Sequence, residues 1–206
     1  LGCGAGQIGQ QLAARLGMLY LDRELLQHAA EELSVSEDAL EHQDETVPTF
    51  WQSLVASFAY GSPEAVYAPP LLNQPNGHEL FATQSRIIAR VAQTQSAVIV
   101  GRGGSHVLRD HPRHVGVFLH ADMAFRIKRV SEAYHLSEQE ARSAVEESDS
   151  SRARYRRAVA NRDWDDARQY HLCLDTGDLD LDAATDIIVA YVERRFGVTA
   201  TEQPPG

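Results

Sequence analysis

The feature that most constrains this chain is its opening, where a glycine-rich stretch leads directly into an amphipathic helix. The glycines of this stretch are Gly2, Gly4, Gly6 and Gly9. Ile8, Leu12 and Leu16 then recur at the four-residue spacing of one apolar helix face, and Gly17 follows as a typical C-cap. Glycine lets the backbone approach an anion closely, and the helix points unpaired N–H groups and its positive dipole end at that anion. The opening therefore predicts a phosphate-binding turn.

Two nucleotide-binding patterns fit this turn. Both the dinucleotide fingerprint and the Gly-x4-Gly half of a P-loop match Gly4 to Gly9. A P-loop continues with a lysine for the phosphates and a serine or threonine for Mg²⁺, where this chain has Gln10 and Gln11. The turn alone leaves both patterns open, as well as a glycine-rich turn without a ligand. Either pattern follows a β-strand, so we expect the sheet to be completed by residues ahead of Leu1 or by another element.

Composition indicates one globular domain. The chain has 206 residues, 43% of them hydrophobic, with no run near the roughly 18 apolar residues of a membrane span. We therefore expect a cytoplasmic protein without membrane contact, which also suits the two widely separated cysteines, Cys3 and Cys173. A net charge of −10 argues against nucleic acid as a partner. The arginine-rich segment 152–162 is a local exception, which charge alone predicts to be a solvated helix face.

Hydrophobic periodicity predicts strands that alternate with helices. The expected strands are 18–22, 97–104, 114–121 and 170–176, and the expected helices are 23–33, 81–92, 123–134 and 181–196. Ser137 and Glu140 form a capping-box pattern, and the acidic residues at 178–186 indicate helix capping rather than a calcium loop. The pattern is typical of a doubly wound parallel sheet with the strand at 97–104 near its centre. Ligands of such sheets bind at the carboxyl ends of the strands, where Asp22 and Arg102 fall.

The order of the motifs resembles the cytidylate kinase-like P-loop family, relatives of bacterial CMP kinase, over nearly the whole chain. The matching pieces are Gly2–Gly9, Tyr20–Arg23, Val98–Gly104, Asp149-Ser150-Ser151-Arg152 and Tyr170–Thr176. The resemblance implies a three-layer α/β fold with a P-loop NTPase-like parallel sheet of the nucleoside monophosphate kinase type, as one domain over 1–206. It also implies a helical acceptor-binding insertion at 31–80 and an arginine-rich lid at 123–168. The tail 199–206 is expected to be disordered.

The resemblance further implies transfer of the γ-phosphoryl group of ATP, with Mg²⁺, to CMP, dCMP or a related small acceptor. ATP would bind at Gly2, Gly4, Ala5, Gly6, Gly9, Gln10 and Gln11. The acceptor would bind at Asp22, Arg23, Arg102, Asp149 and Arg152. The catalytic groups would be Arg102, Arg126, Arg129 and Arg152. Arginines suit this role because phosphoryl transfer depends on positioning and charge neutralisation, although from the residues alone Arg102 could equally form an ordinary salt bridge. No metal site built from protein side chains alone is expected.

Three residues depart from the family pattern. Gln10 and Gln11 replace a basic residue and a hydroxyl, and Gly103 stands where CMP kinase has an aspartate that contacts the base. The departures keep a second hypothesis open, a degenerate member that binds a nucleotide or a partner without catalysis. A third is a NAD(P)-binding Rossmann enzyme, for which Asp22 has an allowed spacing. A homodimer contact through the apolar insertion is also open.

Overall fold

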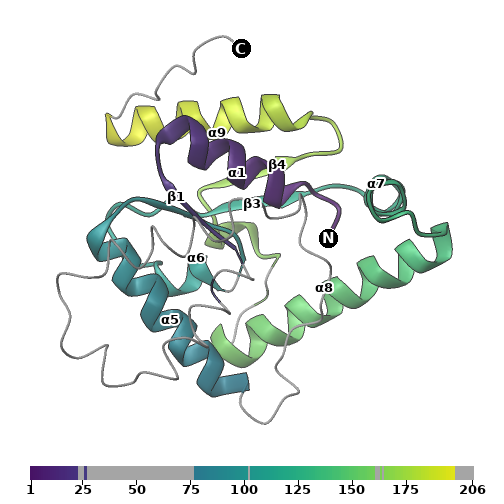
Figure 1. Ribbon diagram of the computed structural model, residues 1–206, viewed down its shortest axis with the longest axis horizontal. Helices are drawn as coiled ribbons and strands as arrows, with labels where there is room; N and C mark the ends of the chain where they lie inside the picture. Colours follow the sequence, from purple (N-terminus) through teal and green to yellow (C-terminus); the bar gives the residue numbers. More distant parts are fainter. Residues whose placement is uncertain (23–25, 27–76, 102, 161–162, 164, 198–206) are drawn as a thin grey trace.

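The computed structural model describes residues 1–22, 26, 77–101, 103–160, 163 and 165–197 (Figure 1). The expected helix at 23–33, apart from Leu26, and most of the expected insertion at 31–80 lie outside the described residues. So do two predicted site residues, Arg23 and Arg102, and the predicted tail.

The strands form two parallel pairs. β1 (Leu19–Leu21) pairs with β2 (Ala97–Ile99), and β3 (Val117–His120) pairs with β4 (Leu172–Asp175). All four lie within the predicted strand segments, and their parallel direction is confirmed. Among the described residues the pairs are two separate sheets rather than the single sheet expected from the sequence.

The helices follow local sequence signals closely. They are α1 (Ala5–Leu16), α5 (Gly77–Thr94), α6 (Gly104–Val107), α7 (Met123–Tyr134), α8 (Glu138–Ala160), the 3₁₀ turn η2 (Ala167–Gln169) and α9 (Leu181–Phe196). Asp122 caps α7 by accepting a hydrogen bond from the Phe125 N–H, and Asp180 caps α9 in the same way. The predicted capping box is confirmed, because Ser137 and Glu140 bond reciprocally at the start of α8.

Helices cover the strands on two faces (Figure 1). On one face α1 and α9 lie side by side over both strand pairs, and Ile8 and Leu12 pack with Ile188 and the β3 residue Val117. On the other face α5 packs against β1 and β2, where Ile88 and Val91 are fully buried. Because one helical layer spans both strand pairs, the two sheets belong to one packed α/β body.

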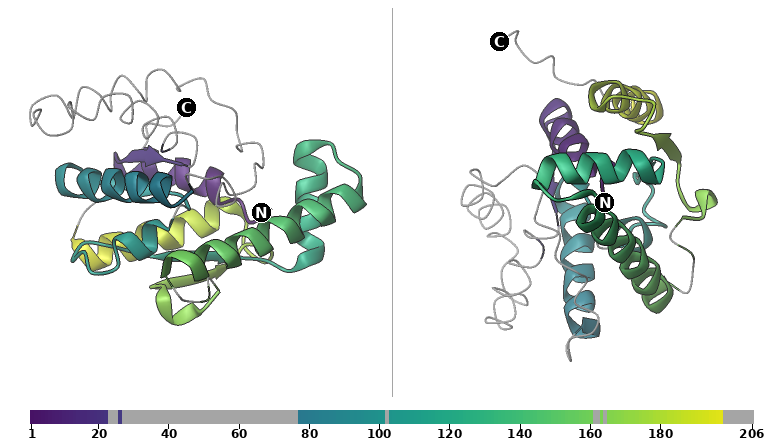
Figure 2. Two further views of the ribbon diagram at one scale, coloured as in Figure 1. Left: turned by 90° about the horizontal axis from the view of Figure 1, so that it is seen from below. Right: turned by 90° about the vertical axis from the view of Figure 1, so that its right-hand side faces the viewer.

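The helices α7 and α8 form a projecting hairpin (Figure 2). Its small core consists of Ile127, Val130, Ala141 and Val145, and Leu1 packs against it. The start of the chain therefore lies beside this hairpin, which falls within the predicted lid. None of the helices in the described part of the chain is both long and apolar enough to cross a membrane.

Candidate functional site

The glycine-rich turn is short and ends at an uncapped helix. Gly4 is the N-cap residue of α1 in a left-handed conformation, with no side-chain capping bond, and the first helical bond runs from the Ile8 N–H to the Gly4 carbonyl. Gly6 and Gly9 therefore lie inside α1 rather than in a longer loop. The N–H groups of the first turn have no partner within the helix, so this end of α1 is suited to an anion.

Glycine is required in the turn because other elements pack tightly against it. Gly2 has a φ of +83°, and a Cβ there would lie 2.8 Å from the Arg126 carbonyl oxygen. Gly4 has a φ of +71°, and its Cβ would collide with Leu181 and lie 3.0 Å from Arg129 Nη2. The turn is thus held between α7 and α9, with the arginines of α7 beside it.

Two predicted arginines share one carboxylate near the turn. Arg126 is 8% exposed and donates from Nη2 to Asp149 Oδ2 at 2.5 Å. Arg152, one helical turn beyond Asp149 on α8, places its Nη1 3.6 Å from Asp149 Oδ1. In the described part of the chain the buried Arg126 Nε has no hydrogen-bond partner. The cluster of Arg126, Asp149 and Arg152 therefore retains positive charge and one unused buried donor.

A cavity of about 900 Å³ brings many of the predicted residues together. Its lining includes Gly2, Gly4, Ala5, Gly6, Gly9, Gln10, Asp22, Arg126 and Arg152. Gly101 and Gly103, which flank Arg102 in the sequence, also line it. The glycine-rich turn, the carboxyl ends of β1 and β2, Arg126 of α7 and Arg152 of α8 therefore meet at one polar end of this cavity.

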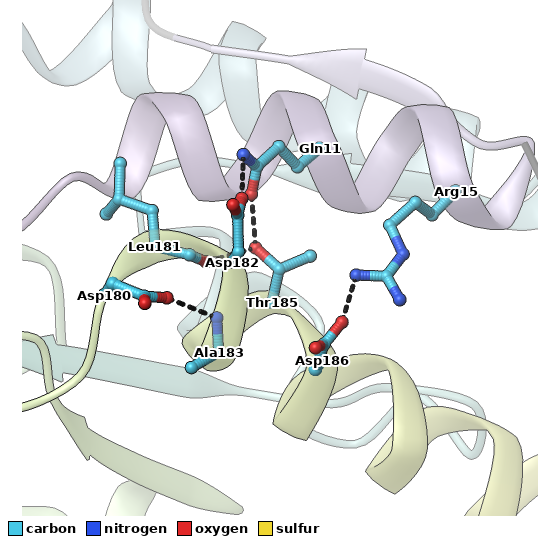
Figure 3. Close-up of polar contacts among 8 residues, drawn as sticks. All are labelled: Gln11, Arg15, Asp180, Leu181, Asp182, Ala183, Thr185 and Asp186. Carbon is cyan, nitrogen blue, oxygen red and sulfur yellow. Dashed lines mark hydrogen bonds and ion pairs between the residues drawn. The ribbon is translucent and has the colours of Figure 1, made fainter. Parts of the chain in front are cut away.

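Gln11 lies elsewhere, at the interface between α1 and α9 (Figure 3). Its amide nitrogen donates to Asp182 at 2.8 Å, and its carbonyl accepts from the Thr185 hydroxyl at 2.6 Å. A short ion pair between Arg15 and Asp186 extends the same interface. The side chain predicted at the Mg²⁺ position is therefore bonded to α9 and does not line the cavity.

The inner part of the cavity is apolar. Val98 and Val100 line it from β2 and its end, and Val117 and Leu119 line it from β3. At the far end burial and the neighbouring His171 lower the pKa of His114 to about 4. Arg113 also lines the cavity near His114, but the end at the glycine-rich turn combines two arginines with the free N–H groups of α1, so the candidate site is that end.

The structure adds two residues that sequence reasoning missed. Ser148 is buried and lines the cavity beside Arg152, and Gln7 accepts a hydrogen bond from Arg129 at 2.6 Å. Gln7 lies inside the glycine motif, but as a variable position it carried no signal. Ser148 directly precedes the Asp149 motif, so the motif indicated this part of the chain but did not indicate that Ser148 lines the cavity.

The described residues fit Mg²⁺ only as an ion held mainly by phosphates. No group of three or more His, Cys, Asp or Glu side chains in that part of the chain could hold a metal ion. Asp22 is the one carboxylate among the described residues that line the cavity. Mg²⁺ commonly binds through one or two carboxylates together with substrate phosphates, and Asp22, which the resemblance assigns to the acceptor, is the carboxylate that this lining could offer it.

Comparison with known proteins places this geometry in a family. The structure resembles an uncharacterized protein from Eubacterium ventriosum ATCC 27560, with 22% identity and a TM-score of 0.67 over 93% of this chain and 94% of that one. A shikimate kinase from Bacteroides thetaiotaomicron is 13% identical with a TM-score of 0.48, covering 94% of each chain. No curated protein matches the sequence. The model of the cytidylate kinase-like family matches residues 1–178, and this chain belongs to that family.

Proposed function

We propose that this protein is an ATP-dependent phosphotransferase of the nucleoside monophosphate kinase type, with CMP, dCMP or a related small phosphorylated acceptor. The observation that carries the proposal is Arg126, a buried guanidinium that lines the cavity at the glycine-rich turn with an unpartnered Nε among the described residues. A buried donor without a partner costs free energy, and a phosphate oxygen would satisfy it. Family membership supports the reaction class.

In the proposed reaction an oxygen of the acceptor phosphate attacks the γ-phosphorus of ATP. The bond from that phosphorus to the β–γ bridging oxygen breaks, and ADP leaves with the bond's electron pair. The N-terminus of α1 would bind the β and γ phosphates, while Arg126 and Arg152 would offset the charge on the transferred group. Bound Mg²⁺ would neutralise charge between the phosphates. By the resemblance, Asp22, Arg23 and Arg102 would hold the acceptor.

Binding without catalysis is the second candidate function, and the position of Gln11 favours it. The side chain that would replace the Mg²⁺-binding hydroxyl is committed to Asp182 and Thr185, and Gln10 brings no charge to the turn. A backbone cradle still binds phosphate in that case. The family match favours the P-loop pattern of the turn over the dinucleotide pattern, which leaves NAD(P) binding as the third candidate. The cytoplasmic location and a homodimer stay predictions.

A ligand screen followed by a turnover assay tests the proposal. Unfolding midpoints are measured with ATP, CMP, AMP, UMP and NAD, each with and without Mg²⁺, since a ligand at 100 times its dissociation constant stabilises by about 2.7 kcal/mol. Release of ADP is then followed for each stabilising pair. The proposal requires ATP and a monophosphate to stabilise the protein and ADP to appear. Nucleotide binding without ADP supports the second candidate, and stabilisation by NAD alone supports the third.

A matched pair of arginine variants ties the activity to the site. Arg152→Ala should lower kcat by roughly a hundredfold, the usual effect of removing one donor to transition-state charge. Arg157→Ala is the control, because Arg157 lies on the same helix, is 71% exposed and pairs with Asp163. Equal losses in both variants would assign the effect to the net charge of α8 rather than to the site.

A further inference from the structure

Arg129 places a second positive charge at the glycine-rich turn. Its Nη2 donates to Gln7 Oε1 at 2.6 Å, and its two terminal nitrogens lie 3.0 and 3.2 Å from where a Gly4 Cβ would be. The contact joins α7 to the first turn of α1. Within the described ranges no carboxylate lies in ion-pairing distance of Arg129, so its one polar partner there is a neutral amide.

The other cations near the turn each have a carboxylate within ion-pairing distance, although Arg126 and Arg152 share a single one. Arg126 and Arg152 share Asp149, whereas Lys128, the only lysine of the chain, is 76% exposed and lies 4.0 Å from Glu132 on the same helix. Lys128 therefore does not replace the lysine that a P-loop would have after its last glycine. The half-buried guanidinium of Arg129 is the group best placed to do so, because a desolvated charge without a counter-ion is stabilised by a bound anion.

We propose that Gln7 is a positioning residue that holds the Arg129 guanidinium beside the N-terminus of α1. There Arg129 supplies to a bound polyphosphate the positive charge that a P-loop lysine supplies elsewhere. A glutamine suits this role because its carbonyl aligns the guanidinium without neutralising it. The inference rests on the proposed nucleotide-binding function and names Arg129 as the source of the positive charge that Gln10 does not provide.

Substitution of Gln7 separates alignment from charge. Gln7→Ala removes the acceptor and releases Arg129, whereas Gln7→Glu keeps an acceptor at the same place and cancels the charge. A glutamate in the first turn of α1 also interacts favourably with the helix dipole and with Arg129. Gln7→Glu should therefore keep or raise the unfolding midpoint while it weakens polyphosphate binding. If the role of Gln7 were purely structural, polyphosphate binding would not weaken while the unfolding midpoint is kept or raised.

The experiment measures dissociation constants for ATP and for inorganic tripolyphosphate by calorimetry, with unfolding midpoints in parallel. Arg129→Ala should weaken both ligands by roughly 10- to 100-fold, the range for a lost hydrogen bond to a charged group. Gln7→Glu should have an effect of similar size, and Gln7→Ala a smaller one. In the Arg129→Ala background Gln7→Ala should have no further effect. Lys128→Ala, which removes an exposed charge from the same helix, should change either constant by less than about twofold.

The outcomes distinguish this inference from the proposed function. If the unsubstituted protein binds ATP and the variants at Gln7 and Arg129 bind it equally well, the inference is wrong and nucleotide binding stands. If tripolyphosphate binds with the expected dependence on both residues but ATP does not bind, the inference stands and the nucleotide function fails. If neither ligand binds the unsubstituted protein, both are overturned.

Discussion

Asp149 is the residue on which the charge balance of the candidate site depends. It accepts from Arg126, which is almost completely buried, and lies within 3.6 Å of Arg152. Removal of one partner from a buried ion pair leaves a desolvated charge without compensation, which costs more than the net contribution of the pair itself. The carboxylate thus offsets part of the charge of two arginines that lie beside the candidate site.

We expect Asp149→Asn to lower the free energy of unfolding by roughly 3 kcal/mol, the usual cost of isolating a buried charge. Urea denaturation at neutral pH measures the change. Added tripolyphosphate should recover part of the loss, since the anion would take the place of the carboxylate beside Arg126. Asp163→Asn is the control, because Asp163 pairs with the exposed Arg157 and its removal should cost less than about 1 kcal/mol. Similar losses of unfolding free energy in both variants would contradict the conclusion that Asp149 compensates a buried charge.

At the scale of elements, the interface of α1 with α9 explains why the chain has Gln11. Thr185 is fully buried and its hydroxyl lies 2.6 Å from the Gln11 carbonyl oxygen, while the amide nitrogen of the same side chain reaches Asp182 (Figure 3). A glutamine at position 11 can accept a hydrogen bond from one residue of α9 and donate one to another. A serine or threonine at this position would be too short to reach both. The interface therefore fixes the angle of the helix whose N-terminus forms the candidate site.

The position of Gln11 predicts a structural effect without a binding effect. Thr185→Val keeps the volume of the side chain but removes the donor, so the free energy of unfolding should fall by about 1 kcal/mol. Gln11→Ala should destabilise the protein to a similar or greater degree, and neither variant should change the Mg²⁺ dependence of ATP binding by more than about twofold. Chemical denaturation and ATP titrations at several Mg²⁺ concentrations measure the two effects. A marked loss of Mg²⁺ dependence in Gln11→Ala would restore Gln11 to the cofactor site.

Local sequence signals predicted the helices well, but they did not predict contacts between residues far apart in the sequence. The sequence predicted α7 and α9 with their observed bounds, because the apolar periodicity of both helices and the acidic residues at the start of α9 act within a few residues. It also predicted that Arg126 and Arg152 belong to the site with the glycine-rich turn, through the family resemblance. The partners of Gln11 are 171 and 174 residues away, and Gln7 is 122 residues from Arg129. No pattern within a single segment indicates such pairs.

At the scale of the whole molecule, the two strand pairs face a shared apolar space. β2 and β3 each pair on one side only within the described ranges, and Val98, Val100, Val117 and Leu119 line the cavity between them. The same helices, α1 and α9, pack over both pairs. The glycine-rich turn, which the sequence predicts to follow a strand, opens at the carboxyl ends of these strands. A strand that leads into Leu1, parallel to β2 and β3, would therefore join the pairs into one sheet.

This arrangement predicts that a strand-forming segment directly ahead of Leu1 stabilises the protein. About six residues rich in valine and isoleucine match the length of an average strand, and their backbone bonds and apolar burial should raise the free energy of unfolding by roughly 3 kcal/mol. In a domain of this size that gain raises the unfolding midpoint by about 6–12 °C. An extension of the same length made of glycine and serine is the control, because it has the same added chain and neither β-propensity nor apolar surface. Hydrogen exchange at the backbone amides of β2 and β3 should slow only with the first extension, since only a paired strand protects those edges. Equal midpoints for the two extensions would show that the space between β2 and β3 does not take a strand.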